Sequence, residues 1–456
     1  MTILATLVLP LTLLIWLVYR GWPILLVAPL TALLAAGLAT DPLLATLTQR
    51  FMPAAGGFVI AFMPLFVLGA VFGKVMEATG AAATLAQWIV TRLGSGRALL
   101  AVVLSCAVLT YGGVSLFVVA FAVYPLATAL FRQANMSERL IPAAIALGSF
   151  TFTMSALPGS PAIQNAIPMP YFGTTAFAAP GLGVIAGTIM ALGGLTYLST
   201  MARRPGFAVP VAALGARTQP DGGRPTLWVA ILPIFTVFAA NWILSRHLLP
   251  GLDLGYLAAP EWGGVTPDQV IGMWALIGAL SLAIVMLLAL TWHRLDAPRA
   301  ALSDGSQAAL LPLFNTAALV GFGSVVAGLP AFAALSAAIT DMPGGVLPSL
   351  AASASLLAGL TGSASGGMSI ALDTLGPSYL QAAQAQGVDP AALHRIVALA
   401  TGGLDALPHN GAVVTLLGIA KLTHREAYGP IFVVAVAIPV VALLATLAVA
   451  TFLGTF

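Results

Sequence analysis

The chain has 456 residues, of which 60% are hydrophobic and only 7% are charged, and its formal net charge is +3. Soluble domains carry roughly 25% charged residues, so this composition cannot build a water-facing surface, and the solvent must be lipid. A net charge this small gives no reason to expect a nucleic-acid partner. The apolar runs are long and continuous rather than alternating, which predicts an all-α polytopic membrane protein instead of a β-barrel.

Apolar runs and their boundaries predict the elements in chain order. The first half contains spans near 3–19, 23–40 and 57–77, an amphipathic stretch at 80–94, a hairpin at about 98–130, a broken helix at about 140–168 and a span at 180–200. After a polar linker, the second half contains spans near 227–246, 268–292 and 308–328, an amphipathic stretch at 331–341, a hairpin at about 345–380, a broken helix at about 391–420 and a span at 430–454. At about 20 residues per crossing, we expect about ten transmembrane helices.

The two halves match at a shift close to 250 residues. The motif MPLF near residue 63 returns as LPLF near residue 311. Two further segments keep the same register: residues 111–115 fall on 361–365, and 156–160 fall on 406–410. This agreement indicates an internal duplication, with a first repeat over residues 1–200 and a second over 227–456.

The distribution of Lys and Arg predicts the orientation. If both hairpins are re-entrant, 14 of the 17 Lys and Arg are cytoplasmic, and only Arg50, Arg246 and Arg395 lie outside. The N-terminus is then periplasmic, the linker at 201–226 is cytoplasmic, and the second repeat is inverted relative to the first. Inverted repeats with broken helices are typical of secondary transporters, whose substrate sites lie at the breaks.

The first break lies in TFTMSALPGSPAIQNAIP, residues 151–168. Pro158 and Pro161 remove backbone donors and Gly159 loosens the chain, so no continuous helix can form. Such a break must face protein or a wet cavity, because unpaired backbone groups are costly in lipid. A half-helix after Pro158 would point its free amides at a carboxylate. The uncharged side chains that could bind a substrate beside Gly159 are Ser155, Ser160, Gln164 and Asn165. The alternative is a proline kink whose Ser and Asn side chains bond the backbone.

The second break, residues 402–417, contains Asp405 and His409 with Asn410 and Gly411 beside them. Asp405 is the carboxylate expected most clearly inside an apolar span, because the others are expected in loops or near span ends. An intramembrane carboxylate costs roughly 2.5–3.5 kcal/mol and therefore needs a partner or a function. Asp405 and His409 could couple transport to a proton. The compatible alternative is that Asp405 caps the broken helix.

The hairpin tips carry small residues and hydroxyls that let the backbone approach a ligand. The candidates are Tyr111, Gly112, Gly113 and Ser115 in the first tip, and Thr361, Gly362, Ser363 and Ser365 in the second. The alternative is a pair of tight turns that their own Ser and Thr residues satisfy. A hydrolase with Ser363 or Ser365 as nucleophile lacks the strand–turn–helix context, so we expect no enzyme. The sequence shows no metal-ligand cluster, and its single cysteine, Cys106, fits a packing role.

Four long segments resemble the gluconate:proton symporter (GntP-type) permeases of the wider ion-transporter superfamily. They read PLFVLGAVFGKVMEATGAAATLA, YGGVSLFVVAFAVYPLA, RLIPAAIALGSFTFTMSALPGSPAIQNAIP and PYFGTTAFAAPGLG, and the resemblance covers nearly the whole chain. It is closest to the branch for short-chain hydroxy acids such as 3-hydroxybutyrate. Sugar-acid members carry an acidic residue in the first hairpin and a His/Pro-rich first break, and the departure of this chain from both features argues against gluconate itself.

The resemblance implies proton-coupled uptake of a small monocarboxylate such as 3-hydroxybutyrate, lactate or a sugar acid. It also implies inverted repeats with scaffold and elevator-type transport domains, a homodimer and a bacterial inner-membrane location. We expect Ser160, Asn165, Ser363, Ser365 and Asn410 to bond the substrate, and Asp405 with His409 to handle the proton.

No Lys or Arg is expected at the membrane midplane, so helix dipoles would supply the positive potential for the carboxylate. No cofactor is expected beyond the coupling ion. Sodium would also fit as that ion, because carbonyls and hydroxyls at the tips can coordinate it. A passive anion channel is the alternative from another class.

Overall fold

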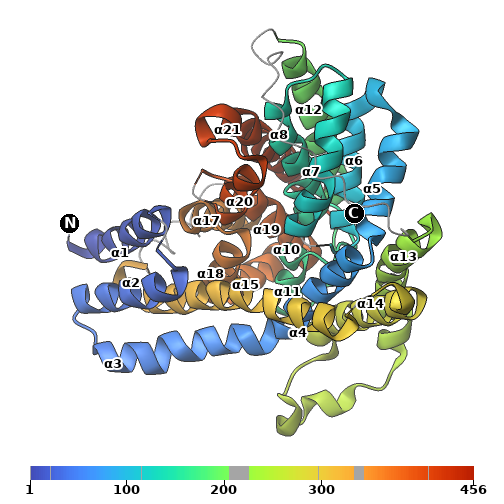
Figure 1. Cartoon of the computed structure of the whole chain (residues 1–456). Coiled ribbons are helices and arrows are strands. Elements are labelled where there is room, and N and C mark those ends of the chain that lie inside the picture. Colours follow the sequence, from blue (N-terminus) through green and yellow to red (C-terminus); the bar gives the residue numbers. More distant parts are fainter. Residues whose placement is uncertain are drawn as a thin grey trace.

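The computed structural model describes residues 2–20, 22–114, 116–204, 225–295, 297–332, 344–408 and 410–456. In these ranges the regular secondary structure is helical, without strands, which confirms the all-α fold class. Most of the predicted linker at 201–226 and of the amphipathic stretch at 331–341 lies outside the described residues, as do Ser115 and His409. The helices form a broad bundle (Figure 1).

The helices of the first half are α1 (Thr2–Tyr19), α2 (Ile24–Leu38), α3 (Leu43–Thr46), α4 (Met52–Ala78), α5 (Ala81–Leu93), α6 (Ala98–Tyr111), α7 (Leu116–Gln133), α8 (Ile141–Ser149), α9 (Phe152–Ser155), α10 (Ile163–Ala166), α11 (Pro168–Phe172) and α12 (Pro180–Ala202). Those of the second half are α13 (Leu227–Ile243), α14 (Pro267–Thr291), α15 (Pro298–Ala327), α17 (Val346–Thr361), α18 (Ala364–Gln386), α19 (Pro390–Leu404), α20 (Gly411–Ala420), α21 (His424–Phe432) and α22 (Ile438–Leu453).

Three π-helical turns continue neighbouring helices, namely η1 (Leu47–Phe51), η5 (Leu244–Leu248) and η10 (Val433–Ala437). Short 3₁₀ turns occur at Ser95–Arg97, Glu138–Leu140, Leu249–Gly251, Gly255–Ala258, Pro260–Trp262 and Trp292–Arg294.

Two long helices, α4 and α15, form an extensive antiparallel pair along one side of the molecule (Figure 1). Gly305 of α15 meets Val71 and Lys74 of α4, whereas Gly321 meets Phe51. A Cβ atom on Gly305 would lie 2.8 Å from the Cα of Val71, so only glycine allows this close approach. The MPLF and LPLF motifs lie on these two helices.

Both long helices begin earlier than predicted. Helical structure runs without interruption over 36 residues from Leu43 to Ala78, and α15 begins at Pro298 instead of near residue 308. Polar side chains in the added turns suggested loops. Several of these polar residues are exposed on the helix surface, including Thr48, Gln49 and Asp304, and exposed polar side chains do not oppose helix formation there.

Each predicted hairpin is a pair of contacting helices with a tight turn between them, α6 with α7 and α17 with α18. Helices α6 and α17 have 14 and 16 residues. At 1.5 Å per residue they are roughly 21 and 24 Å long, too short for a hydrocarbon core of about 30 Å. This length fits re-entrant hairpins, and re-entry stays a prediction.

Helix α18 continues through Pro377 to Gln386 and carries Asp373 near its middle. The expectation that carboxylates other than Asp405 lie in loops or near span ends was therefore wrong for Asp373. A proline inside a membrane helix is tolerated when neighbouring groups satisfy the freed carbonyl, so the helix can continue.

Six helical segments among the described residues are long and apolar enough to cross a membrane, and five shorter apolar helices have 10–17 residues. Large apolar side chains cover the outside, for example Ile60 at 82% and Trp228 at 77% exposure. Water would oppose such a surface, so these faces contact lipid. The chain is a multi-pass membrane protein, and the count of about ten spans stays a prediction.

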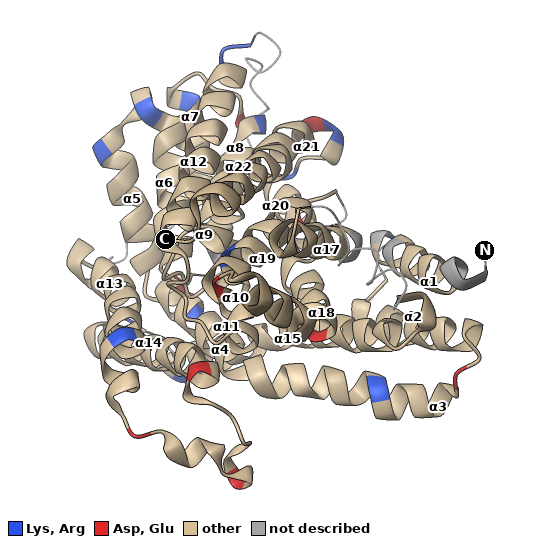
Figure 2. Ribbon diagram, turned by 180° about the vertical axis from the view of Figure 1, so that it is seen from behind, with Lys and Arg blue, Asp and Glu red and all other residues tan. Residues whose placement is uncertain are grey.

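Basic residues gather at the end of the bundle where α5, α7, α12 and α21 meet the surface (Figure 2). Arg92 and Arg132 lie in the last turns of α5 and α7, and Arg203 caps α12. A basic end is typical of the cytoplasmic side. The predicted orientation, with the N-terminus periplasmic, rests on this pattern.

Candidate functional site

The first break separates α9 from α10 between Ser155 and Ile163. Gly159 has φ +83° and donates its N–H to the carbonyl of Ala176 at 2.8 Å. The chain becomes helical again at Ile163: α10 continues through Ile167, which has helical φ and ψ, into α11, so a short half-helix follows the break. The break itself is a loop that the rest of the protein holds in place.

Asn165 and Ser160 bond the backbone of this loop. Asn165 Nδ2 donates to the carbonyls of Ser160 and Ala176 at 2.9 Å each. The Ser160 hydroxyl accepts from the N–H of Ala162 at 3.3 Å, and the residue is fully buried. In this conformation both side chains shape the break.

Arg395 of α19 lies fully buried beneath the first break. Its guanidinium donates to the carbonyls of Ala178, Ala176 and Ser155, with the shortest bond, Nη2 to Ala178, at 2.9 Å. None of the ion pairs found in the described ranges involves Arg395. The sequence provides no reason to expect a Lys or Arg near the substrate site and leaves the positive potential to helix dipoles, whereas the structure places the buried guanidinium of Arg395 beside the first break. Arg395 is five residues from the start of α19, so from the sequence it resembled a residue at a span end.

The neighbouring side chain, His394, is also fully buried. Its Nδ1 lies 2.7 Å from the hydroxyl of Thr174, and its Nε2 lies 3.1 Å from Oδ1 of Asn165. Helix α19 of the second half thus contacts the break of the first half through His394 and Arg395. The local sequence alone does not show this contact, because it joins segments more than 200 residues apart.

The second break, between Leu404 and Gly411, is held differently. Asn410 caps α20, since its Oδ1 accepts from the N–H groups of Ala412 and Val413 at 2.7 and 3.0 Å. The Asp405 carboxyl group meets the backbone N–H of Ala364, and its Oδ1 is buried with no hydrogen-bond partner among the described residues. The predicted pairing of Asp405 with His409 involves a residue outside those ranges.

Each hairpin tip contacts the break of its own half. The hydroxyl of Tyr111 donates to the carbonyl of Pro158 at 2.5 Å, and Asn410 Nδ2 donates to the carbonyl of Gly362 at 2.9 Å. Gly362 takes a left-handed conformation, φ +61°, at the turn. The duplicated segments therefore meet in both halves, as a site built at the breaks requires.

A cavity of about 550 Å³ brings the first tip, the first break, α4, α15 and the second tip together. We call it the break cavity. Its lining includes Leu65, Phe66, Gly69, Ala70, Lys74 and Glu77 of α4, Thr110, Gly113, Val114, Leu116, Met154, Pro161, Ala162, Ile163 and Gln164 of the first half, Ala308, Ala309, Pro312 and Thr316 of α15, and Ser365.

Two buried polar atoms in the break cavity lack partners. Thr110 Oγ1 and Gln164 Oε1 have no hydrogen-bond partner among the described residues. Buried polar atoms are almost always bonded, so unbonded ones that line a cavity indicate a place for a ligand. Lys74, paired with Glu77 at 3.3 Å and about one-third exposed, supplies a cation to the same cavity.

The structure divides the predicted site residues into two groups. Gly113, Gln164 and Ser365 line the break cavity, and Ser365 lies 3.4 Å from the hydroxyls of Thr316 and Ser363. The others bond or shape the backbone of the tips and breaks: Tyr111, Gly112, Ser155, Gly159, Ser160, Asn165, Gly362, Ser363, Asn410 and Gly411. Thr361 ends α17, and its side chain is not among those described.

Among the break-cavity residues that sequence reasoning missed are Thr110, Lys74 and Glu77. Thr110 directly precedes the predicted tip, and Lys74 and Glu77 lie near the end of an apolar helix. Charged side chains on an apolar helix could have pointed to Lys74 and Glu77, because such charges in or near the membrane need a function or a partner.

The profile of the GntP family permeases matches residues 1–239. The chain belongs to this family. A GntP permease is a membrane transporter, and not an enzyme. This GntP permease is 42% identical over 445 residues to the uncharacterized transporter YxjC of Bacillus subtilis (strain 168), which covers 93% of the chain and 94% of the relative. An uncharacterized transporter of Haemophilus influenzae is 32% identical over 151 residues, 33% of this chain and 34% of the relative.

Two solved transporters share the fold of this GntP permease. The Alcanivorax borkumensis YdaH transporter superposes with a TM-score of 0.54 at 18% identity, covering 87% of this chain and 86% of that one. Neisseria gonorrhoeae MtrF, described as illuminating a class of antimetabolite efflux pumps, gives a TM-score of 0.54 at 13% identity, with 90% and 84% covered. At these identities the likeness concerns the fold alone.

Proposed function

We propose that this GntP permease is a secondary active transporter that takes up a small hydroxy monocarboxylate together with a proton across the bacterial inner membrane. The observation that carries the proposal is the break cavity, where Thr110 Oγ1 and Gln164 Oε1 lack partners and Lys74 supplies a cation. These groups come from the first tip, the first break and α4, which are separate elements.

The polar groups match the two functions of a hydroxy acid. A carboxylate needs a cation and hydrogen-bond donors, which the ammonium of Lys74 and the hydroxyl of Thr110 supply. A substrate hydroxyl needs an acceptor, which Gln164 Oε1 supplies. The buried charge of Arg395 adds positive potential to the first break. Most of the cavity lining is apolar, which suits a short carbon chain.

The predicted substrate contacts at Ser160, Asn165, Ser363 and Asn410 belong to the same proposal. In this conformation these side chains bond the backbone, so they would reach the substrate only when the breaks rearrange. Such a rearrangement fits an elevator-type motion, in which a transport domain built from two inverted repeats slides against a scaffold domain. We also propose that the chain forms a homodimer. Asp405, whose buried Oδ1 is unbonded, is a proton-coupling group in this scheme.

Reconstitution into liposomes tests the function. With an inward proton gradient and labelled 3-hydroxybutyrate, lactate or gluconate outside, we expect accumulation of a hydroxy monocarboxylate above the external concentration. Uptake that stops at equilibration contradicts active transport and identifies a passive channel. Accumulation that needs a sodium gradient instead of a proton gradient contradicts proton coupling.

A further inference from the structure

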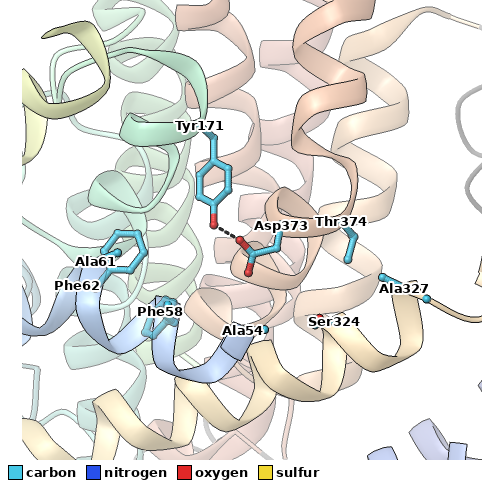
Figure 3. A pocket seen from close by; sticks show the side chains of 11 residues that line it. Ala54, Phe58, Ala61, Phe62, Tyr171, Ser324, Ala327, Asp373 and Thr374 are labelled. Atoms are coloured by element: carbon cyan, nitrogen blue, oxygen red, sulfur yellow. Dashed lines mark hydrogen bonds between the residues drawn. The ribbon is translucent and has the colours of Figure 1, made fainter. Parts of the chain in front are cut away.

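A second cavity, of about 540 Å³, lies farther along the α4–α15 pair (Figure 3). We call it the Asp373 cavity. Its lining consists of Ala54, Gly57, Phe58, Ala61 and Phe62 of α4, Tyr171 of α11, Ser324, Ala327 and Gly328 at the end of α15, and Asp373 and Thr374 of α18. The break cavity begins at Leu65 of α4, so the two cavities are neighbours along one helix.

Asp373 is the carboxylate of this cavity, and its hydrogen-bond partner is a neutral group. The hydroxyl of Tyr171 points at the Asp373 carboxylate and donates a hydrogen bond to it (Figure 3). None of the ion pairs in the described ranges involves Asp373. The Asp373 side chain is exposed and faces this cavity. A carboxylate in a membrane protein that lacks a counter-charge attracts a cation.

Arg299 and Asp304 lie near the start of α15, whereas the cavity is lined by the end of that helix. Other charged or titratable groups on the packed elements have partners of their own. On α19, Arg395 bonds carbonyls and His394 bonds Thr174 and Asn165. On α18, Tyr379 bonds Ser349 and Ser353. Arg50, which approaches Gly328 at the cavity edge, pairs with Asp41 at 2.9 Å. The part of α4 that lines the cavity, residues 54–62, and helix α17 carry no ionisable side chain.

The Tyr171 hydrogen bond links the two halves. Tyr171 follows the first break by a few residues, and the segment from Gln164 to Tyr171 runs from the break cavity to the Asp373 cavity. An ionised Asp373 accepts a hydrogen bond from the Tyr171 hydroxyl, and protonation of Asp373 weakens this bond because the negative charge is lost. The charge state of Asp373 therefore changes a bond that holds the segment next to the substrate cavity.

We propose that Asp373 binds the coupling proton from the Asp373 cavity and that Tyr171 transmits its binding to the first break. A proton from bulk water adds to a carboxylate oxygen of Asp373, and the same O–H bond breaks when the proton leaves on the other side. In this scheme Asp373 and Asp405 both bind protons. The proton on Asp373 neutralises its carboxylate before the transport domain moves. This inference rests on the proposed function for its transport consequences, but proton binding itself does not require a substrate.

Infrared difference spectroscopy of the purified protein tests proton binding without a substrate. On acidification, we expect the carbonyl stretch of a protonated carboxyl group that Asp373→Asn removes and that Asp304→Asn, an exposed control on α15, keeps. Tyr171→Phe should change the frequency of this band, because the carboxyl group loses its donor. If Asp373→Asn leaves the whole titrating band in place, Asp373 does not bind the proton and the inference is overturned.

Transport by the same variants tests coupling. In liposomes with labelled 3-hydroxybutyrate, lactate or gluconate, Asp373→Asn should lower proton-driven accumulation about tenfold or more while keeping exchange between equal internal and external pools. Tyr171→Phe, which keeps the aromatic ring, should reduce accumulation more than exchange.

Two outcomes contradict the proposed role of Asp373 in coupling transport to the proton. Accumulation by Asp373→Asn at the level of wild type overturns the coupling role. Equal losses of accumulation and exchange in both variants indicate a structural hydrogen bond only, and also overturn it. If wild type accumulates none of the acids, the proposed function fails, and the infrared titration still decides whether Asp373 binds a proton.

Discussion

The two breaks occupy the same register of the duplicated sequence, but the protein holds them in different ways. The first break carries no ionisable residue, and Arg395 of the other half donates to the carbonyl of Ser155 at its start and to that of Ala178 in the loop after α11. The second break carries Asp405 and caps itself through Asn410. Equivalent positions in a repeat therefore do not have equivalent roles. The first break depends on α19 of the other half for its shape, whereas the second depends on its own residues, its tip and α21 of the same half.

This difference gives the first break two fully buried partners from the other half, Arg395 and His394. Arg395 and His394 hold it on one side, and the break cavity with its unbonded Thr110 and Gln164 lies on the other. A loop that buried contacts fix in one conformation can present polar groups to a ligand with little loss of conformational entropy on binding. Substitutions at the two breaks should therefore have unequal effects.

The largest effect is expected for Arg395→Met. The variant keeps an unbranched apolar side chain but leaves the carbonyls of Ser155, Ala176 and Ala178 with fewer donors, each at a cost of about 1–3 kcal/mol. We expect little folded protein by size-exclusion chromatography in detergent. The control is Arg50→Met, which removes a guanidinium that is 47% exposed and should cost under about 1 kcal/mol. Equal yields of the two variants would show that Arg395 does not hold the break.

Single substitutions that remove one hydrogen-bonding partner from each break should have smaller effects, and they compare the two breaks directly. His394→Leu leaves Thr174 and Asn165 without a buried partner and should lower the free energy of unfolding by about 3 kcal/mol. Tyr428→Phe removes the half-buried hydroxyl that donates to Ala406 of the second break at 3.1 Å, and should cost about 1 kcal/mol. Unfolding titrations with SDS in mixed micelles measure both. A larger loss for Tyr428→Phe would reverse the comparison.

Lys74 should affect substrate affinity more than stability, because it is partly exposed at the break cavity. Lys74→Gln removes the cation and should raise the KM for uptake about tenfold, with little change in maximal rate. Uptake kinetics in liposomes measure this change. An unchanged KM would place the anion elsewhere.

The smallest effect is expected for Glu77→Gln. This variant keeps the size of the side chain but removes the carboxylate that competes with the substrate for Lys74. The KM should fall about two- to threefold, opposite in sign to the change for Lys74→Gln. A rise in KM would indicate that Glu77 positions Lys74 for the substrate.

The sequence was sufficient for features that depend on local chemistry. Continuous apolar runs predicted an all-helical membrane protein. The prolines at 158 and 161 predicted an interruption at the first break, and the structure indeed has no helix between Ser155 and Ile163. The sequence also suggested a helix cap at the second break but assigned it to Asp405, whereas the residue that caps α20 is Asn410. The inverted repeats, the orientation and the elevator motion remain predictions.

The features that the sequence did not predict depend on contacts between distant segments. Arg395 is buried only because carbonyls of residues 155–178 surround it, and no local pattern contains that information. Asp373 lies inside a helix that continues past a proline. The break cavity requires α4 and α15 to meet the first tip, which places Thr110 and Lys74 in one site.

The central claim is that the break cavity binds a hydroxy acid through Gln164. Uptake of 3-hydroxybutyrate in competition with butyrate tests it most directly, in wild type and in Gln164→Leu. We predict that wild type prefers the hydroxy acid by about tenfold or more, because a buried acceptor left unpaired is costly, and that Gln164→Leu loses this preference. A preference for 3-hydroxybutyrate that is unchanged in Gln164→Leu would contradict the account.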